Sequence, residues 1–226
     1  MKTWMKYREY LLAGEWHVHT SYTDGKNSVF EMCARAKELG LPLIAFTEHV
    51  RKNLSYDFNE FLSDIERGRE EFPELIILSG FEAKVLPDCT LDVEKSLFRE
   101  VDYPIFAFHS FPDDKELYLE CLKTVIKHPS INTWAHPGLF IKKMGFNINQ
   151  RELEEIFTLL KSHSVLLEIN KKYQLPPEKW IDLAFKHGVN FVRGSDVHSI
   201  NSLFGSSDRL WVQTLIRRNN EWEFQQ

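Results

Sequence analysis

The chain has 226 residues, a length that fits one α/β domain of barrel size or two small domains. Hydrophobic residues make up 43% of it and the net charge is -5, so it can fill a sizeable core and is mildly acidic. That balance argues against a general nucleic-acid binder, which needs a basic face. We find no signal-peptide pattern and no run near the roughly 18 apolar residues of a membrane span. We therefore expect a cytoplasmic protein with no membrane partner.

Three cysteines, Cys33, Cys89 and Cys121, stand far apart in the sequence. An odd number without a C-x-x-C pair argues against a disulfide framework and against a cysteine-rich zinc site. We interpret all three as small buried side chains in a reducing compartment.

Strand-like apolar runs alternate along the chain with amphipathic helical patterns, which is typical of βα units around a mainly parallel sheet. The predicted strands cover residues 16–20, 43–47, 75–85, 105–108, 131–135, 165–169 and 189–193. Apolar residues at helical spacing predict helices near 29–39, 58–72, 114–125, 153–160 and 177–185. Ser28 and Glu31 form a candidate capping box. Seven such units predict a compact α/β barrel in a single domain over residues 1–226, with the tail after Leu203 unassigned.

Side chains of the metal-ligand type stand where the predicted strands end. The first strand ends in His17-Val18-His19, and this two-residue spacing puts both imidazoles on one face. The ends of other strands carry, in chain order, His49, Glu82, His109, His136, Asp196 and His198. Parallel barrels have their active sites at this face, so we predict one metal cluster there. Mixed imidazole and carboxylate ligands favour zinc, manganese or iron over magnesium or calcium.

The other three histidines, His128, His163 and His187, lie in or near predicted helix C-termini. A protonated imidazole is favourable at that end of the helix dipole, so we predict a structural role for them.

The order of these motifs resembles the PHP (polymerase and histidinol phosphatase) superfamily of metal-dependent phosphoesterases, here as a stand-alone domain. The resemblance rests on His17-Val-His19-Thr-Ser-Tyr-Thr-Asp24-Gly25, Thr47-Glu48-His49, Gly80-Phe81-Glu82, His109-Ser110, Ala135-His136-Pro137 and Asp196-Val197-His198, within residues 15–198. It implies a distorted seven-stranded (β/α)7 barrel with up to three metals.

The resemblance also implies the ligands of each metal. The first site would use His17, His19, Glu82 and Asp196, the second would use Glu82 as a bridge with His109 and His136, and the third would use Asp24, His49 and His198. Some members of the superfamily have a histidine where this chain has Asp24. We take Glu82, Asp196 and His198 as the candidate catalytic residues.

The charge of such a cluster favours a phosphoester substrate. Two aspartates and one glutamate contribute about three negative charges, whereas three divalent metals would contribute about six positive ones. Two metals can share a water, lower its pKa and direct the hydroxide at phosphorus, so no serine or cysteine nucleophile is needed. We therefore predict hydrolysis of a small phosphomonoester, such as histidinol phosphate or a nucleotide, with two or three divalent transition metals.

Basic residues follow several of the same strands. The pairs Arg51-Lys52, Lys142-Lys143 and Lys171-Lys172 lie on loops of the predicted metal face, and Lys84 and Arg193 lie near strand ends. Cations on one rim are suited to holding a substrate phosphate. The candidates for this role are Arg51, Lys84, Lys143 and Arg193.

Other functions remain open from the sequence. An exonuclease or phosphodiesterase acting on nucleic-acid ends is one, because PHP domains also occur in bacterial DNA polymerases. A phosphotyrosyl protein is a third substrate class. An amidohydrolase-type enzyme also begins with H-x-H on its first strand, and a non-catalytic scaffold would bind metal without turnover.

Overall fold

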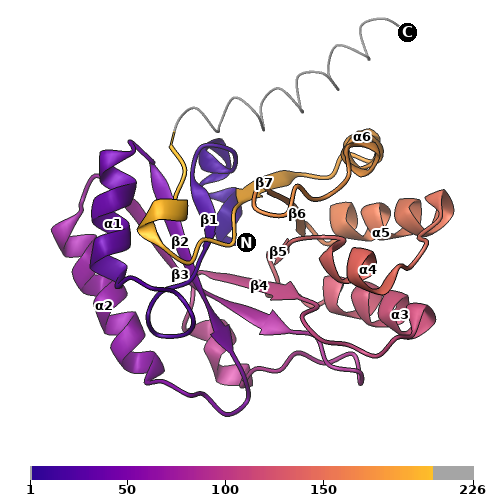
Figure 1. Ribbon diagram of the computed structural model, residues 1–226, viewed down its shortest axis with the longest axis horizontal. Helices are drawn as coiled ribbons and strands as arrows, with labels where there is room; N and C mark the ends of the chain where they lie inside the picture. The colour runs from indigo at the N-terminus through magenta and orange to yellow at the C-terminus, as the bar shows by residue number, and fades with distance from the viewer. Residues whose placement is uncertain (1, 206–226) are drawn as a thin grey trace, which may run out of the picture.

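The computed structural model describes residues 2–205, which form a seven-stranded sheet in the order β1 to β7 (Figure 1). The strands are β1 (Glu15–Val18), β2 (Leu43–Val50), β3 (Ile76–Lys84), β4 (Tyr103–Ala107), β5 (Thr133–Trp134), β6 (Leu166–Asn170) and β7 (Phe191–Gly194). Every neighbouring pair is parallel. A further parallel bridge joins Val18 to Val197, just after β7, and nearly closes the sheet. The predicted seven-stranded α/β barrel is confirmed.

The described residues contain six α-helices that pack outside these strands. They are α1 (Val29–Glu38), α2 (Phe58–Glu71), α3 (Lys115–Ile126), α4 (Leu139–Met144), α5 (Gln150–Ser162) and α6 (Glu178–Lys186). Short 3-10 helices are η1 (Thr3–Met5), η2 (Arg8–Tyr10), η3 (Lys95–Arg99) and η4 (Ile200–Ser202). Figure 1 shows α1 and α2 on one flank of the strands and α3 to α6 on the other. The sequence did not predict α4, because six residues are too few for a helical period to be visible.

Local sequence signals explain where several helices begin. Ser28 accepts a hydrogen bond from the backbone of Glu31, whose side chain accepts one from the backbone of Ser28, so the predicted capping box is confirmed. Asp114 accepts from the backbone of Leu117 and caps α3. These side chains satisfy N–H groups that have no partner within the helix.

The core has two parts, one between strands and helices and one inside the barrel. The interior part includes Leu43, Leu78 and Ile105 and is covered by Trp4 and Leu11 from the N-terminal segment. Because apolar side chains fill the interior, polar side chains meet above it, at the carboxyl ends of the strands.

The cysteines correct one prediction. Cys89, in the loop after β3, forms a disulfide with Cys121 of α3, and their Cα atoms are 4.4 Å apart. They are 32 positions apart in sequence, and the fold rather than a local motif brings them together. The expectation of three unpaired thiols was therefore wrong. Cys33 is free and buried, as predicted. None of the helices in residues 2–205 is both long and apolar enough to cross a bilayer.

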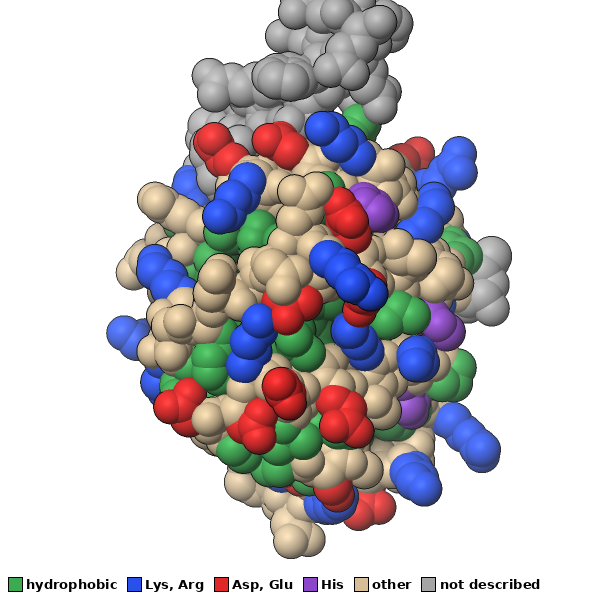
Figure 2. All heavy atoms as spheres, turned by 90° about the vertical axis from the view of Figure 1, so that its right-hand side faces the viewer, with side chains coloured by type: hydrophobic (Ala, Val, Ile, Leu, Met, Phe, Trp, Pro, Cys, Tyr) green, Lys and Arg blue, Asp and Glu red, His purple; other side chains and the backbone are tan. Residues whose placement is uncertain are grey.

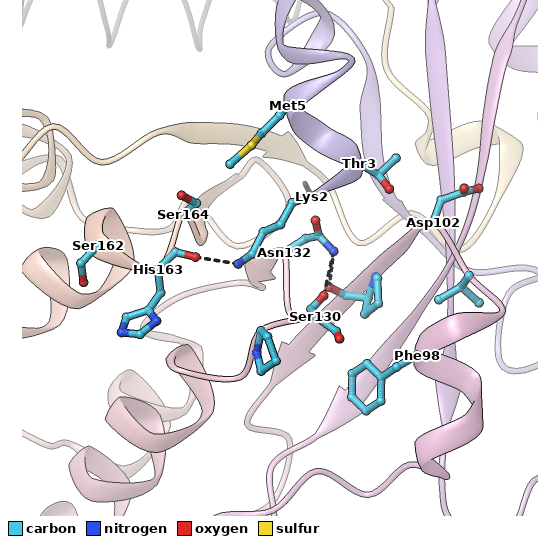
Figure 3. Close-up of a pocket in the computed structure, with 13 residues that line it drawn as sticks. Lys2, Thr3, Met5, Phe98, Asp102, Ser130, Asn132, Ser162, His163 and Ser164 are labelled. Carbon is cyan, nitrogen blue, oxygen red and sulfur yellow. Dashed lines mark hydrogen bonds between the residues drawn. The ribbon is translucent and has the colours of Figure 1, made fainter.

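A cavity of about 550 Å³ lies at the amino ends of the strands, opposite to the predicted metal face (Figure 3). Its lining includes Lys2, Asp102 and Asn132, and none of the nine predicted ligands. Lys2 Nζ lies 2.7 Å from the carbonyl oxygen of His163 and 2.5 Å from that of Ile131. Lys2 therefore ties the N-terminal segment to the loops before β5 and β6.

Candidate metal centre

The paired histidines of the first strand lie where their spacing predicts. His17 lies in β1, which ends at Val18, and its carbonyl oxygen accepts from the backbone N–H of Val197, 3.0 Å away. The backbone of His19 donates to the carbonyl of Val197 at 2.8 Å, which holds both residues against the end of β7. Their Nε2 atoms are 3.1 Å apart, so the two imidazoles converge on one point.

Glu82 of β3 lies at the middle of the cluster and is fully buried. His49 of β2 is its direct partner in the parallel register, which places the two side chains side by side. Five imidazoles lie within 4 Å of its carboxylate: His136 at 2.9 Å and His17 at 3.6 Å from Oε1, and His49 at 3.0 Å, His109 at 3.2 Å and His19 at 3.7 Å from Oε2. A single carboxylate thus faces five imidazoles from four segments of the barrel, the ends of β1, β2, β4 and β5.

Two of the predicted ligands have left-handed backbone conformations. Asp196, just after β7, has φ 49°, and His136, just after β5, has φ 30°. Such conformations are costly for residues other than glycine and gather at functional sites. Asp196 Oδ1 lies 3.3 Å from His19 Nε2 and 3.6 Å from His17 Nε2. The strained turn therefore directs this carboxylate to the paired histidines.

A tight loop after β1 brings Asp24 to the outer side of the cluster. A Cβ at Gly25 would lie 2.3 Å from the carbonyl oxygen of His19, so the loop can fold back so closely because this residue is glycine. Asp24 Oδ2 lies 3.2 Å from His198 Nε2 and 3.4 Å from His49 Nε2. The Asp24 side chain is 54% exposed, so this outer group is open to solvent whereas Glu82 is not.

Three sets of ligand atoms each lie within 4.8 Å of one another. They are His17, His19 and Glu82; His49, Glu82 and His109; and His19, Asp24, His49 and His198. The structure thus brings all nine predicted ligands into one cluster, with His136 and Asp196 in contact with members of these sets. These sets differ from the expected grouping in two respects: His19 and His49 each belong to two sets, and Asp196 and His136 lie beside the sets rather than in them.

Unpaired polar atoms show that this donor set fits divalent metal ions. Glu82 Oε2 and the Nδ1 atoms of His19, His49 and His109 are buried without a hydrogen-bond partner. A buried polar atom left unpaired costs about 1–3 kcal/mol, so several in one cluster need a ligand. Imidazole nitrogens and carboxylate oxygens together are the donors that zinc and similar metals prefer.

The electrostatics favour the metal-binding form of Glu82 and His19, whereas at His17 the neighbouring Glu168 and Glu82 outweigh burial and raise the pKa well above its ordinary value. Burial raises the pKa of Glu82, but the neighbouring imidazoles, His109 and His17 first, hold that pKa well below its usual range. Burial lowers the pKa of His19 to about 4, so its imidazole is neutral at neutral pH. Ionised carboxylates and neutral imidazoles are the forms that coordinate metal.

Three buried acids that the sequence did not identify contact the segments that carry these ligands. Glu168 of β6 accepts from His17 Nδ1 at 2.7 Å, and Glu15 of β1 accepts from the backbone of Ser195 at 2.8 Å. Glu48 of β2 accepts from the backbone of Thr20 at 2.7 Å, and burial raises its pKa to about 7. Glu168 lies within a predicted strand, and Glu15 and Glu48 each lie next to the end of one. Because a buried carboxylate is costly unless it is paired, that position is a signal for a buried partner.

Arg193 does not belong to the rim, and its prediction as a phosphate ligand is wrong. Its side chain is 2% exposed, and Nη2 lies 3.5 Å from Glu15 Oε2 inside the barrel. The same nitrogen donates to the carbonyl of Phe204 at 2.8 Å. The position of Arg193 near a strand end did not show that its side chain points into the barrel, because that direction depends on how the neighbouring strands pack.

The other predicted cations lie on segments of the metal face. Arg51 follows β2 directly, is 41% exposed, and has Nε 3.6 Å from Asp92 Oδ2. Lys84 ends β3 and is half-buried, whereas Lys143 on α4 is exposed. The structure adds Lys172, whose Nζ lies 2.7 Å from Asp196 Oδ2.

A buried carboxylate among imidazoles at the carboxyl ends of a parallel barrel defines the class: a metal-dependent hydrolase with an α/β barrel. The family model of the PHP domain matches residues 15–172. The chain belongs to the PHP domain family.

Relatives of known description share this region. The chain is 27% identical over 208 residues to the DNA polymerase/3'-5' exonuclease PolX of Bacillus subtilis, a match that covers 85% of this chain and 35% of that protein. It therefore spans about a third of the polymerase's length. It is 25% identical over 207 residues to a protein of Acetivibrio thermocellus named "Probable phosphatase", which covers 86% of this chain and 83% of that one.

Solved structures share the fold. The histidinol phosphate phosphatase of Lactococcus lactis, crystallised with zinc, L-histidinol and phosphate, superposes with a TM-score of 0.68 at 20% identity. The match covers 91% of this chain and 92% of that one.

Proposed function

We propose that this protein is a phosphatase that hydrolyses a small phosphomonoester, such as histidinol phosphate or a nucleotide. The observation that carries the proposal is the Glu82 carboxylate, which five imidazoles surround and whose Oε2 has no hydrogen-bond partner. The name of the Acetivibrio relative, and the zinc and phosphate bound in the Lactococcus structure, support the same activity.

The residues that would hold two or three divalent metals are the nine of the cluster: His17, His19, Asp24, His49, Glu82, His109, His136, Asp196 and His198. Zinc is our first candidate, and manganese and iron are the others, because the donors are mixed nitrogen and oxygen. When bound, such metals supply an activated water and neutralise negative charge on the phosphoryl oxygens.

The chain's own residues set the geometry of this reaction. Glu82 positions the groups on either side of it, because Oε1 faces His17 and His136 while Oε2 faces the other imidazoles. Asp196 and His198 lie together at one side of the cluster: His198 Nδ1 lies 2.8 Å from the carbonyl oxygen of Asp196, and the His198 side chain is 25% exposed. We propose that Asp196 and His198 orient the substrate against the cluster.

Cations beside the cluster favour a dianionic substrate. Arg51 stands two residues beyond His49, and Lys172, just after β6, contacts Asp196 through its ammonium group. We propose that Arg51 and Lys172 hold the substrate phosphate. A monoester dianion interacts with two such cations more strongly than a diester monoanion does.

The surface over α3 to α6 supports a small substrate. Figure 2 shows acidic and basic side chains interspersed on this face rather than gathered into a basic track. An extended single strand needs a positive groove with aromatic platforms. A nuclease acting on nucleic-acid ends is the second candidate, and the match to PolX is the observation that favours it.

The first experiment compares ester classes. The measurement is kcat/KM for a nitrophenyl phosphate monoester and for the corresponding bis-ester, with zinc or manganese at one fixed concentration. We expect the monoester to have the larger kcat/KM. A ratio below one, together with degradation of single-stranded oligonucleotides, would identify a nuclease instead.

The second experiment counts metals. Elemental analysis of protein purified without chelator should find two or three transition-metal ions per chain. Less than one metal per chain after reconstitution with zinc or manganese would refute the proposed cluster. Bound metal without hydrolysis of any ester would identify a scaffold, and hydrolysis of an amide substrate alone would identify an amidohydrolase.

A further inference from the structure

Glu168 contacts two candidate metal ligands without being one. It lies on β6, its side chain is 1% exposed, and its two oxygens face different partners. Oε1 lies 2.7 Å from His17 Nδ1, and Oε2 accepts the backbone N–H of His136. We infer that Glu168 is a positioning residue that sets the tautomer of His17 and the backbone turn of His136. The inference rests on the proposed function, because it concerns the same cluster.

The contact with His17 determines which ring nitrogen is free. When Nδ1 carries the proton and donates to Glu168, the lone pair is on Nε2. That atom lies 3.1 Å from His19 Nε2 and 3.6 Å from Glu82 Oε1, inside the cluster. Metal-binding histidines commonly donate their second N–H to a carboxylate, which orients the ring. Glu168 therefore gives His17 the tautomer that can bind metal.

The contact with His136 holds a strained segment. His136 has φ 30°, and its Nε2 lies 2.9 Å from Glu82 Oε1. A backbone in this conformation needs external hydrogen bonds to persist. Glu168 supplies one, and so links the end of β5 to β1, which are not neighbours in the sheet.

Gly194 supplies an independent observation, because it leaves the space that the carboxylate fills. A Cβ at this position of β7 would lie 1.9 Å from Glu168 Oε1 and 2.9 Å from His17 Cβ. No larger residue fits unless the carboxylate or the imidazole moves. The close approach of three strands thus depends on glycine at 194 and on glutamate at 168.

A purely structural role for Glu168 is the alternative, and Glu15 provides the matched control. Glu15 is also a fully buried carboxylate inside the barrel. Its Oε1 accepts from the backbones of Ser195 at 2.8 Å and His17 at 3.4 Å, and its Oε2 lies 3.5 Å from Arg193 Nη2. Among residues 2–205 it contacts no imidazole nitrogen. Loss of either acid should destabilise the fold, whereas only loss of Glu168 should weaken metal binding.

The test uses the full chain and three variants, Glu168→Gln, Glu168→Asp and Glu15→Gln. Zinc affinity is measured by competition with a chromogenic chelator in the absence of substrate, and thermal unfolding of the metal-free protein is measured alongside. Glutamine keeps the shape of the side chain but has only one oxygen to accept from His17 Nδ1 and from the backbone N–H of His136. We therefore expect Glu168→Gln to bind its tightest zinc about 10- to 100-fold more weakly. Aspartate keeps the charge and should recover part of that loss.

Glu15→Gln should lower the unfolding temperature and leave zinc affinity near that of the wild type. Unchanged zinc affinity in both Glu168 variants would overturn the inference, as would an equal loss in Glu15→Gln. If Glu168→Gln does not fold, zinc affinity is compared between Glu168→Asp and Glu15→Gln. Weaker zinc binding in Glu168→Asp alone supports the inference, and equal affinities overturn it. Because zinc affinity is measured without substrate, a protein that binds zinc through this contact but hydrolyses no phosphomonoester would refute the proposed function alone.

Discussion

At the scale of the residue, the two oxygens of Glu82 face two different groups of imidazoles. Oε1 faces His17 and His136, and Oε2 faces His49, His109 and His19. Full burial ensures that water does not compete for either oxygen. One side chain therefore sets the spacing between the groups that would hold metal.

Glu82→Ala should abolish hydrolysis, with a fall in kcat/KM of more than about a thousandfold, as for residues that act as one unit. The far-ultraviolet circular dichroism should remain that of the wild type, because β3 keeps its parallel ladder. Near-normal turnover of any phosphoester by this variant would show that the carboxylate is misassigned.

Arg51→Ala should raise KM for a phosphomonoester by about 10- to 100-fold with a small change in kcat, because one charge-assisted hydrogen bond contributes about 1.5–3 kcal/mol. The control is Arg35→Ala, since Arg35 pairs with Glu38 on the outer helix α1. An equal KM in both variants would show that Arg51 does not bind the substrate phosphate.

At the scale of the element, helix caps contribute stability away from the chemistry. Ser28 forms both hydrogen bonds of its capping box at the start of α1, and Asn149 does the same with Glu152 at α5. These contacts are local in sequence, so the amino-acid pattern alone predicted the first of them. The loop that carries Asp24 leads directly into α1, so this cap also anchors the outer side of the cluster.

Ser28→Ala should lower the free energy of unfolding by about 1 kcal/mol, the usual cost of losing an N-cap. Equilibrium denaturation in urea measures it. In the control Ser63→Ala, the lost hydroxyl donates to the carbonyl of Asn59 within α2, a contact that adds little stability. Equal effects of the two substitutions would show that the cap at Ser28 is not formed in solution.

At the scale of the whole molecule, the two ends of the barrel differ. The carboxyl end holds the ligand cluster, whereas the amino end is covered by the N-terminal segment and contains the cavity beside Lys2. Lys2 donates across this end to Ile131 and His163, and burial lowers its pKa from the ordinary 10.5 to about 8.

The stability of the wild type relative to Lys2→Met should therefore depend on pH. Between about pH 8 and 10.5 the unfolded chain holds a proton on Lys2 that the folded chain has released, so the free energy of unfolding rises with pH in this window. Below pH 8 both states are protonated and the difference should be flat. Denaturant titrations across this range measure the difference, and parallel curves for the two proteins would contradict the depressed pKa.

The sequence by itself determined the seven strands, five of the six helices in residues 2–205 and the candidate ligands at the strand ends, because these depend on local spacing, whereas Asp24 was assigned from the resemblance to the PHP superfamily. Alternation of apolar runs with helical patterns predicted seven βα-like units, and the two-residue spacing of His17 and His19 placed both rings on one face. The parallel direction of the strands then put all the strand ends at one face of the barrel.

Only the tertiary structure decided which side chains meet. Arg193 pairs with Glu15 inside the barrel, and Glu168 reaches His17 from a strand 151 positions away. The disulfide between Cys89 and Cys121 likewise depends on how the β3 loop packs against α3. Local periodicity indicates the face of a strand on which a residue lies, but partners depend on the closure of the barrel, and that closure is a property of the whole chain.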